Sequence, residues 1–147
     1  YFINELDRWC WRAQRYGGSY GLLFLDIDQL KLINDTHGHA AGDAVICGVA
    51  QAMASTTRKS DIVARVGGDE FAILLDNISA DKLGDKTAAM QQLLADLPVK
   101  TAGPVLKVNV SIGHYLIQSS SRAPDALAEA DQSMYANKRA KYAQGAG

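Results

Sequence analysis

Residues 61–75 read Asp61-Ile62-Val63-Ala64-Arg65-Val66-Gly67-Gly68-Asp69-Glu70-Phe71-Ala72-Ile73-Leu74-Leu75. Two apolar runs flank a pair of glycines, and glycine adopts positive φ at no steric cost. We therefore expect a β-hairpin with strands over residues 61–66 and 70–75 and a tight turn at Gly67-Gly68. An acidic pair, Asp69-Glu70, stands where the second strand begins.

A second strand with acids at its end is expected upstream. Residues 20–27 form a near-continuous apolar run, which is typical of a central strand buried on both faces. Asp26 and Asp28 close this run. If the strand lies beside the hairpin, the carboxylates of Asp26, Asp69 and Glu70 converge at one edge of a sheet.

The remaining pattern predicts helices that alternate with strands. Apolar periodicity indicates helices over residues 2–15, 42–58, 79–97 and 125–142, a short helical turn over 29–34, a polar loop over 35–39 and a strand over 106–115. Ser79 is the expected N-cap of its helix, and Pro98 follows that helix. This alternation favours an α/β fold with one central sheet flanked by helices.

Composition limits the class of protein. A chain of 147 residues fits a single domain spanning residues 1–147. No apolar stretch approaches the ~20 residues of a membrane span, so we expect no membrane contact by this domain. The net charge of −1 argues against nucleic-acid binding. Two cysteines without metal-type spacing indicate neither a disulfide framework nor a zinc site, and they suit a cytoplasmic location.

The three expected carboxylates point to a divalent cation. Buried carboxylates repel one another unless a cation joins them. Ligation by oxygen alone favours a hard cation, which we expect to be Mg²⁺, with Mn²⁺ as the alternative. Such an ion can hold phosphate oxygens and activate a hydroxyl group. On spacing alone, acids that merely flank turns explain the pattern equally well.

The chain resembles the GGDEF diguanylate cyclase family in several motifs that occur in the family's order: residues 26–39 with Gly42-Asp43, residues 67–71, residues 110–113 and residues 130–135. The resemblance covers almost the whole chain. It implies a mostly antiparallel sheet flanked by helices, like the adenylyl cyclase catalytic core and the polymerase palm. It also implies that two GTP molecules are joined into cyclic di-GMP with release of two pyrophosphates.

The same resemblance implies roles for single residues at the metal. Asp26 and Asp69 match side-chain metal ligands, and Ile27 matches a ligand through its carbonyl. Glu70 matches a metal ligand or a base for the ribose 3′-hydroxyl.

Further positions match residues that bind GTP. Asn34 and Asp43 match the guanine readers, and aspartate can accept hydrogen bonds from guanine N1–H and the 2-amino group, which adenine lacks. Simpler interpretations are an Asx-turn at Asn34 and a first-turn helix acid at Asp43. Lys31 and Lys138 match phosphate-binding lysines, and the backbone amides of Gln29 and Leu30 would also face phosphate. Gly67 and Gly68 match glycines whose backbone passes close to the nucleotide. His39 matches a motif histidine, for which we expect a buried structural role.

The resemblance also implies partners and regulation. Two domains would face each other head to tail as a homodimer, one GTP in each, under the control of an upstream sensory domain. The domain would then be cytoplasmic, either free or as the cytoplasmic part of a membrane-bound sensor. Arg58 and Asp61 match the RxxD site at which cyclic di-GMP inhibits the enzyme; an ordinary surface pair is the alternative.

The chain departs from the family pattern at two places. Lys141-Tyr142 stands where the family carries Gly-Arg, so a phosphate-contacting arginine is missing, and Lys141 or Arg139 are the cations available to replace it. The N-terminal Leu-Thr-Gly-Leu-x-Asn-Arg landmark is absent, which leads us to expect a fragment of a longer sensor protein. The alternatives to an active cyclase are a catalytically quiet sensor of GTP or cyclic di-GMP and, less favoured because of Asp43, a cyclase with adenine-containing products.

Overall fold

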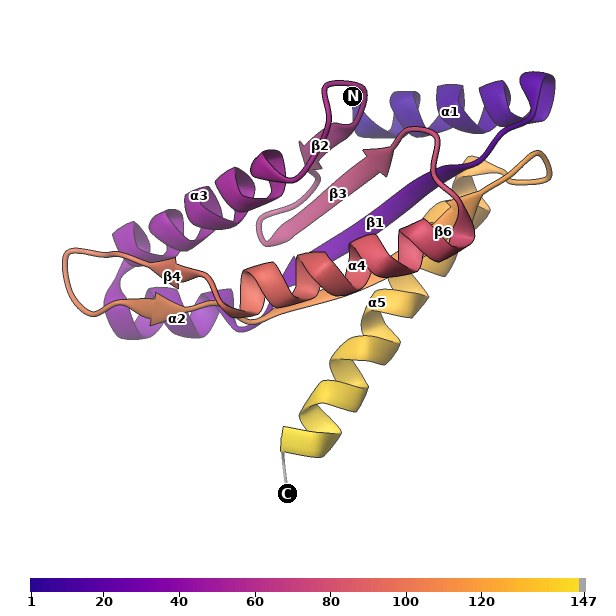
Figure 1. The fold of residues 1–147 in the computed structure, drawn as a ribbon. Helices are drawn as coiled ribbons and strands as arrows, with labels where there is room; N and C mark the ends of the chain where they lie inside the picture. The colour runs from indigo at the N-terminus through magenta and orange to yellow at the C-terminus, as the bar shows by residue number, and fades with distance from the viewer. Residues whose placement is uncertain (146–147) are drawn as a thin grey trace.

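The computed structural model describes residues 1–145 and confirms the expected α/β fold (Figure 1). Four antiparallel strands form the main sheet in the order β2-β3-β1-β6, and β4 and β5 form a small second sheet. In chain order the elements are α1 (Phe2–Tyr16), β1 (Tyr20–Ile27), α2 (Leu30–His37), α3 (His39–Ser55), β2 (Ile62–Arg65), β3 (Glu70–Leu75), α4 (Ala80–Ala95), β4 (Pro98–Val99), β5 (Leu106–Lys107), β6 (Val110–Ile117) and α5 (Ala123–Gly145).

Strand β1 is the centre of the sheet, as its apolar run predicts. It is buried along its whole length except at Asp26, which is partly exposed. Successive side chains of a strand point to opposite faces. Leu23, Leu25 and Ile27 therefore pack under α2, α3 and α4, whereas Leu22 and Phe24 pack under α1 and α5. The sheet thus lies between two helical layers (Figure 1).

Helix α5 crosses β6 at very short range because residue 113 has no side chain. A Cβ at Gly113 would lie 2.1 Å from the backbone nitrogen of Met134 and 2.3 Å from the carbonyl oxygen of Ala130. Both atoms are helix backbone, so neither can move without shifting α5. This close approach fixes α5 over the end of β1, where the acids lie.

We predict that Gly113→Ala destabilises the chain by at least about 3 kcal/mol, the upper range for overpacking a core, because α5 must move away from the sheet. The measurement is the free energy of unfolding in urea. Gly84→Ala, in helix α4 with no atom within 4 Å of the added Cβ, is the matched control. It should stabilise the chain by about 0.5–1 kcal/mol, since alanine is the better helix former.

The structure corrects the prediction for residues 29–58. Instead of a short turn and a polar loop over 35–39, α2 continues to His37, and α3 begins at His39 rather than at residue 42 and ends at Ser55 rather than 58. The break falls on Gly38, whose φ of 92° ends the helix and whose N–H donates to the carbonyl oxygen of Asn34. The two-residue strand β4 was not expected. Within residues 1–145, none of the helices has the length and hydropathy to cross a membrane.

Candidate active site

The sheet brings the predicted acids to one edge. Asp26 of β1 lies directly opposite Glu70 of β3 on one side and Ser111 of β6 on the other. The tip of the hairpin is held at the end of β1, because the N–H of Ile27 donates to the carbonyl oxygen of Asp69 at 2.8 Å. Asp26, Asp69 and Glu70 are therefore neighbours at the end of β1. Within residues 1–145, no three histidine, cysteine, aspartate or glutamate side chains form a group that could hold a metal by themselves.

The carboxyl group of Asp26 is in an unusual electrostatic environment. Burial raises its pKa to about 6, the ammonium group of Lys138 opposes this rise, and the nearby charge of Asp69 adds to it. Lys138 Nζ lies 3.0 Å from Asp26 Oδ2. The other oxygen, Oδ1, is buried and has no hydrogen-bond partner among the described residues. An orphan carboxylate oxygen of this kind suits a cation.

This raised pKa predicts how stability changes with pH. Because the folded-state pKa of Asp26 exceeds its ordinary value of 3.8, protonation favours the folded chain, and that contribution is lost as the pH rises from 3.8 through about 6. Without metal, Asp26→Asn should therefore be more stable than the wild type at pH 7.5, by up to about 3 kcal/mol. The difference should nearly vanish at pH 4. Urea unfolding in EDTA at both pH values measures it; a pH-independent difference would contradict the assigned shift.

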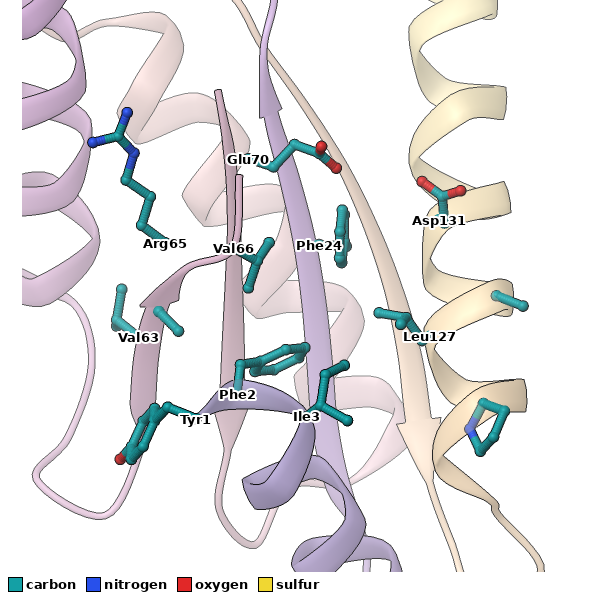
Figure 2. A pocket seen from close by; sticks show the side chains of 13 residues that line it. Tyr1, Phe2, Ile3, Phe24, Val63, Arg65, Val66, Glu70, Leu127 and Asp131 are labelled. Atoms are coloured by element: carbon teal, nitrogen blue, oxygen red, sulfur yellow. The ribbon is translucent and has the colours of Figure 1, made fainter. Parts of the chain in front are cut away.

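Glu70 lines a cavity between the sheet and α5. The cavity, of about 990 Å³, is lined mainly by apolar side chains from the start of α1, the sheet and α5. Figure 2 shows the carboxylates of Glu70 and Asp131 facing each other across it. Burial raises the pKa of Glu70, and the charges of Asp69 and Asp131 raise it further. Sequence reasoning missed the contribution of Asp131.

Asp28 is the most deeply buried acid of the site, and its contacts were also missed. Its side chain is 0% exposed. Both of its oxygens accept from Ser111 Oγ at 3.0 Å, and Oδ2 accepts from Lys141 Nζ at 2.9 Å. Lys141 Nζ also donates to the carbonyl oxygen of Val110 at 3.0 Å, and Lys138 Nζ lies 3.6 Å from Asp28 Oδ1. Lys138 and Lys141 of α5 thus face Asp26, in β1, and Asp28, just after β1.

The N-terminus of α2 follows these acids directly. Gln29, at φ 58°, turns the chain into the helix, and no side chain caps the first turn. The first amides of a helix have no partner within it and favour an anion. Gln29 and Lys31 are exposed, whereas the side chain of Leu30 is buried. The amides of residues 29–31 are therefore available beside the carboxylates.

Asn34 and Asp43 come from adjacent helices. Gly42 of α3 lies against the Asn34 side chain so closely that a Cβ would be 1.8 Å from Asn34 Oδ1. Asp43 follows Gly42 and is exposed. Because α3 begins at His39, Asp43 is not in the first turn, which removes the macrodipole interpretation. His39 is exposed, so the buried structural role expected for it is wrong.

A comparison with protein families decides the family. The family described as "Diguanylate cyclase, GGDEF domain" matches residues 1–144. The chain is a GGDEF domain.

Curated relatives agree with this assignment. Diguanylate cyclase TpbB of Pseudomonas aeruginosa is 35% identical over 145 residues, which cover 95% of this chain and 32% of the relative. The probable diguanylate cyclase DgcE of Escherichia coli is 36% identical over 120 residues, 81% of this chain and 11% of the relative. The domain spans a third or less of the length of these relatives.

Solved structures share the fold. The GGDEF domain of DgcB from Caulobacter crescentus, solved in complex with c-di-GMP, superposes with a TM-score of 0.89 at 31% identity and covers 95% of this chain and 81% of that one. Diguanylate cyclase SiaD from Pseudomonas aeruginosa, solved with its activator SiaC, gives a TM-score of 0.87 at 32% identity over 95% of this chain and 54% of that one.

The hairpin of the GGDEF domain forms as predicted, but for a different reason. Positive φ among the described glycines occurs at residues 17, 18 and 38, not at Gly67 or Gly68. The turn is instead held by Arg65, whose guanidinium donates to the carbonyl oxygens of Gly67 at 3.2 Å and Gly68 at 2.7 Å. A Cβ at Gly68 would meet no atom within 4 Å, so the protein itself leaves that side of the turn open.

The cations considered as substitutes for the missing arginine are engaged elsewhere. Lys141 is bound to Asp28 and Val110, and the guanidinium of Arg139 lies 5.7 Å from the centre of the Tyr135 ring. Tyr142 occupies the arginine position. Burial, and then the charge of Asp28, raises the pKa of its hydroxyl. The GGDEF domain therefore has Lys138, and not Lys141, as the α5 cation facing Asp26.

Arg58 and Asp61 are paired as their spacing predicts, and Asp61 also has a structural function. Its side chain is 2% exposed and that of Arg58 is 61% exposed. Asp61 accepts from the backbone N–H groups of Arg58 at 2.8 Å and Asp76 at 2.9 Å. Both residues line a cavity of about 460 Å³ that also contains Lys82 and Lys86, two cations that sequence reasoning did not include.

Proposed function

We propose that this GGDEF domain is a diguanylate cyclase that joins two GTP molecules into cyclic di-GMP and releases two pyrophosphates. The observation that carries the proposal is the arrangement at the end of β1. There, Asp26 faces Glu70 and Lys138, next to the uncapped N-terminus of α2. Carboxylates for a metal and amides for phosphates thus stand side by side, which is what a reaction at a triphosphate requires.

The triphosphate would bind at the start of α2. The amides of Gln29 and Leu30 supply donors, and the side chains of Lys31 and Lys138 supply positive charge. Lys138 has its pKa raised by its hydrogen bond to Asp26, so it is charged at neutral pH. Its ammonium can contact a phosphate oxygen while it remains near that acid.

The residues present fit Mg²⁺ or Mn²⁺. Asp26 Oδ1 is a buried oxygen without a partner among the described residues. The proposed ligands are all oxygens, as hard cations prefer: the carboxylates of Asp26 and Asp69, the carbonyl of Ile27, and Glu70 as a ligand or as the base for the 3′-hydroxyl. When bound, the ion would neutralise charge that develops on the phosphates.

Asn34 and Asp43 would read the guanine base. Their helices meet at Gly42, the residue before Asp43, which lies against the Asn34 side chain. A methyl group at Gly42 would overlap Asn34 Oδ1 at 1.8 Å and turn the amide out of position. The predicted consequence is a loss of GTP binding.

We predict that Gly42→Ala raises the KM for GTP about 10-fold, the cost of losing a hydrogen bond of about 1.4 kcal/mol, with a smaller change in kcat. Steady-state kinetics on the wild type and the variant measure this. Gly48→Ala on the same helix is the control, because its Cβ would meet only side-chain methyl groups, of Val99 at 3.3 Å and of Leu97 at 3.8 Å. Equal effects of the two substitutions would show that α3 tolerates no added methyl and would remove the argument about Asn34.

Catalysis would need two domains. One GTP per domain, held head to tail, places each 3′-hydroxyl in line with the α-phosphorus of the other GTP, so that pyrophosphate leaves. Fixing both nucleotides converts a bimolecular encounter into a local one, which supplies much of the acceleration. We further propose that a sensory domain controls this pairing, that cyclic di-GMP inhibits at Arg58 and Asp61, and that the domain acts in the cytoplasm, where GTP is available.

One observation favours a second candidate function, a quiet sensor that binds GTP or cyclic di-GMP without turnover. Tyr142 occupies the position of the family's phosphate-contacting arginine, and Lys141 is engaged by Asp28. Weaker binding of the triphosphate would reduce turnover, while Asn34 and Asp43 would still bind the guanine base.

The test is synthesis of product by a dimer. The domain, fused to a dimerising coiled coil, is incubated with GTP and Mg²⁺, and cyclic di-GMP and pyrophosphate are quantified. Formation of both supports the cyclase, and the rate per domain should rise with dimerisation. Nucleotide binding without product would replace the cyclase by the sensor.

A further inference from the structure

Asp28 is a buried acid for which the proposed reaction has no role. Its side chain is 0% exposed, and a buried carboxylate is stable only when it is paired and hydrogen-bonded. Ser111 supplies a neutral donor to both oxygens at 3.0 Å. Lys141 supplies the positive charge at 2.9 Å. Without Lys141, the only other cation close to Asp28 among the described residues is Lys138, 3.6 Å away.

Lys138 is therefore shared between two acids. Its ammonium lies 3.0 Å from Asp26 Oδ2 and 3.6 Å from Asp28 Oδ1. The shorter distance is a direct hydrogen bond and the longer one is not. This asymmetry exists while Lys141 neutralises Asp28. Lys141 also binds the carbonyl oxygen of Val110, which fixes its head group between β1 and β6.

We infer that Lys141 is a positioning residue: it holds Asp28 so that Lys138 stays on Asp26, at the triphosphate site. The ion-pair arrangement is a property of the chain itself, whereas its effect on GTP rests on the proposed function. Lys141 thus compensates for the missing arginine indirectly, through Lys138. Through Lys138, the Lys141–Asp28 pair supports Asp26, a proposed metal ligand, and substitutions of residues that support a metal ligand typically cost 10–100-fold in affinity or activity.

The first experiment needs no nucleotide. In a crystal structure of Lys141→Met, Lys138 Nζ should move to within about 3 Å of Asp28 and leave Asp26 Oδ2. The melting temperature of the variant is measured as well, because a buried carboxylate that loses its cation partner also destabilises the fold. If Lys138 stays on Asp26 in the variant, the inference is overturned, whatever the loss of stability.

Where Lys141→Met does not fold, Asp28→Asn carries the same test. Asparagine keeps a hydrogen-bonding partner for Ser111 without the charge, so Lys138 should remain on Asp26, and Asp28→Asn with Lys141→Met should keep it there as well. A Lys138 that leaves Asp26 in the double variant would show that Lys141 acts on α5 as a whole and not through Asp28, which also overturns the inference.

The second experiment measures binding of 3′-deoxy-GTP with Mg²⁺, since this nucleotide lacks the attacking hydroxyl and cannot condense. Lys141→Met should weaken binding about 10–100-fold, and Lys141→Arg and the double variant should recover most of it. Arg139→Met is the control, because it removes one positive charge from an exposed position of α5 that faces Tyr135. Equal losses in Lys141→Met and Arg139→Met would indicate a general charge effect and contradict positioning.

The two proposals fail separately. If the wild type binds 3′-deoxy-GTP but makes no cyclic di-GMP, the proposed cyclase activity is contradicted. The inference about Lys141 is then still tested by the binding measurements on the variants. A wild type that binds no nucleotide contradicts both the cyclase and the effect of Lys141 on GTP, and the crystal structures then decide the ion-pair arrangement alone.

Discussion

Replacing Asp69 and Glu70 together by alanine should lower cyclic di-GMP synthesis by at least about 10³-fold while the domain stays folded. The loss corresponds to about 4 kcal/mol of transition-state stabilisation, a magnitude expected when a catalytic metal loses its carboxylate ligands. The rate of product formation by the dimerised domain measures it.

The expected folding of this variant separates catalysis from structure. The charge of Asp69 raises the pKa values of both Asp26 and Glu70, so these acids repel one another in the absence of metal. Their removal should leave the melting temperature unchanged or raise it. Asp125→Ala with Glu129→Ala, two exposed acids of α5, is the control with the same change in net charge and should keep full activity. Retained turnover in the 69/70 variant would remove these acids from the mechanism.

The sequence predicts well those parts of the fold that are marked by a pattern of residue types along one continuous stretch of chain. Residues 20–27 form a near-continuous apolar run, preceded by a Gly-Gly-Ser break and closed by the acids Asp26 and Asp28, so both ends of β1 could be predicted. The end of α2 could not, because residues 35–37 are polar yet remain helical. That helix stops only where Gly38 adopts φ 92°, and polarity alone says nothing of such a stop.

The candidate site divides in the same way. Asp26 and Glu70 were expected together because both stand at strand ends, and the register places them opposite each other. The pairing of Asp28 with Lys141 joins residues 113 positions apart, and no periodicity links them. Its only trace in the sequence is the departure from the family's glycine at position 141. The hydrogen bonds of Arg65 in the hairpin turn also depend on the folded backbone.

The RxxD pair gives the second large effect. Arg58→Ala should raise the concentration of cyclic di-GMP that halves the rate by about 10–100-fold, because a hydrogen bond from a charged donor contributes about 1.5–3 kcal/mol. The initial rate should stay close to that of the wild type, since Arg58 lies next to Asp76, at the opposite end of β3 from Glu70. The measurement is the initial rate as a function of added cyclic di-GMP.

The two members of the pair should behave differently because their burial differs. Arg58 is largely exposed and can reorient toward a ligand, together with Lys82 and Lys86 in the same cavity. Asp61 is buried and accepts two backbone N–H groups, so Asp61→Ala should cost about 2–5 kcal/mol of stability through those unpaired donors. Lys59→Ala, an exposed neighbour, should change neither inhibition nor stability. If Arg58→Ala leaves inhibition unchanged, the pair only closes the turn before β2, and product control must reside elsewhere.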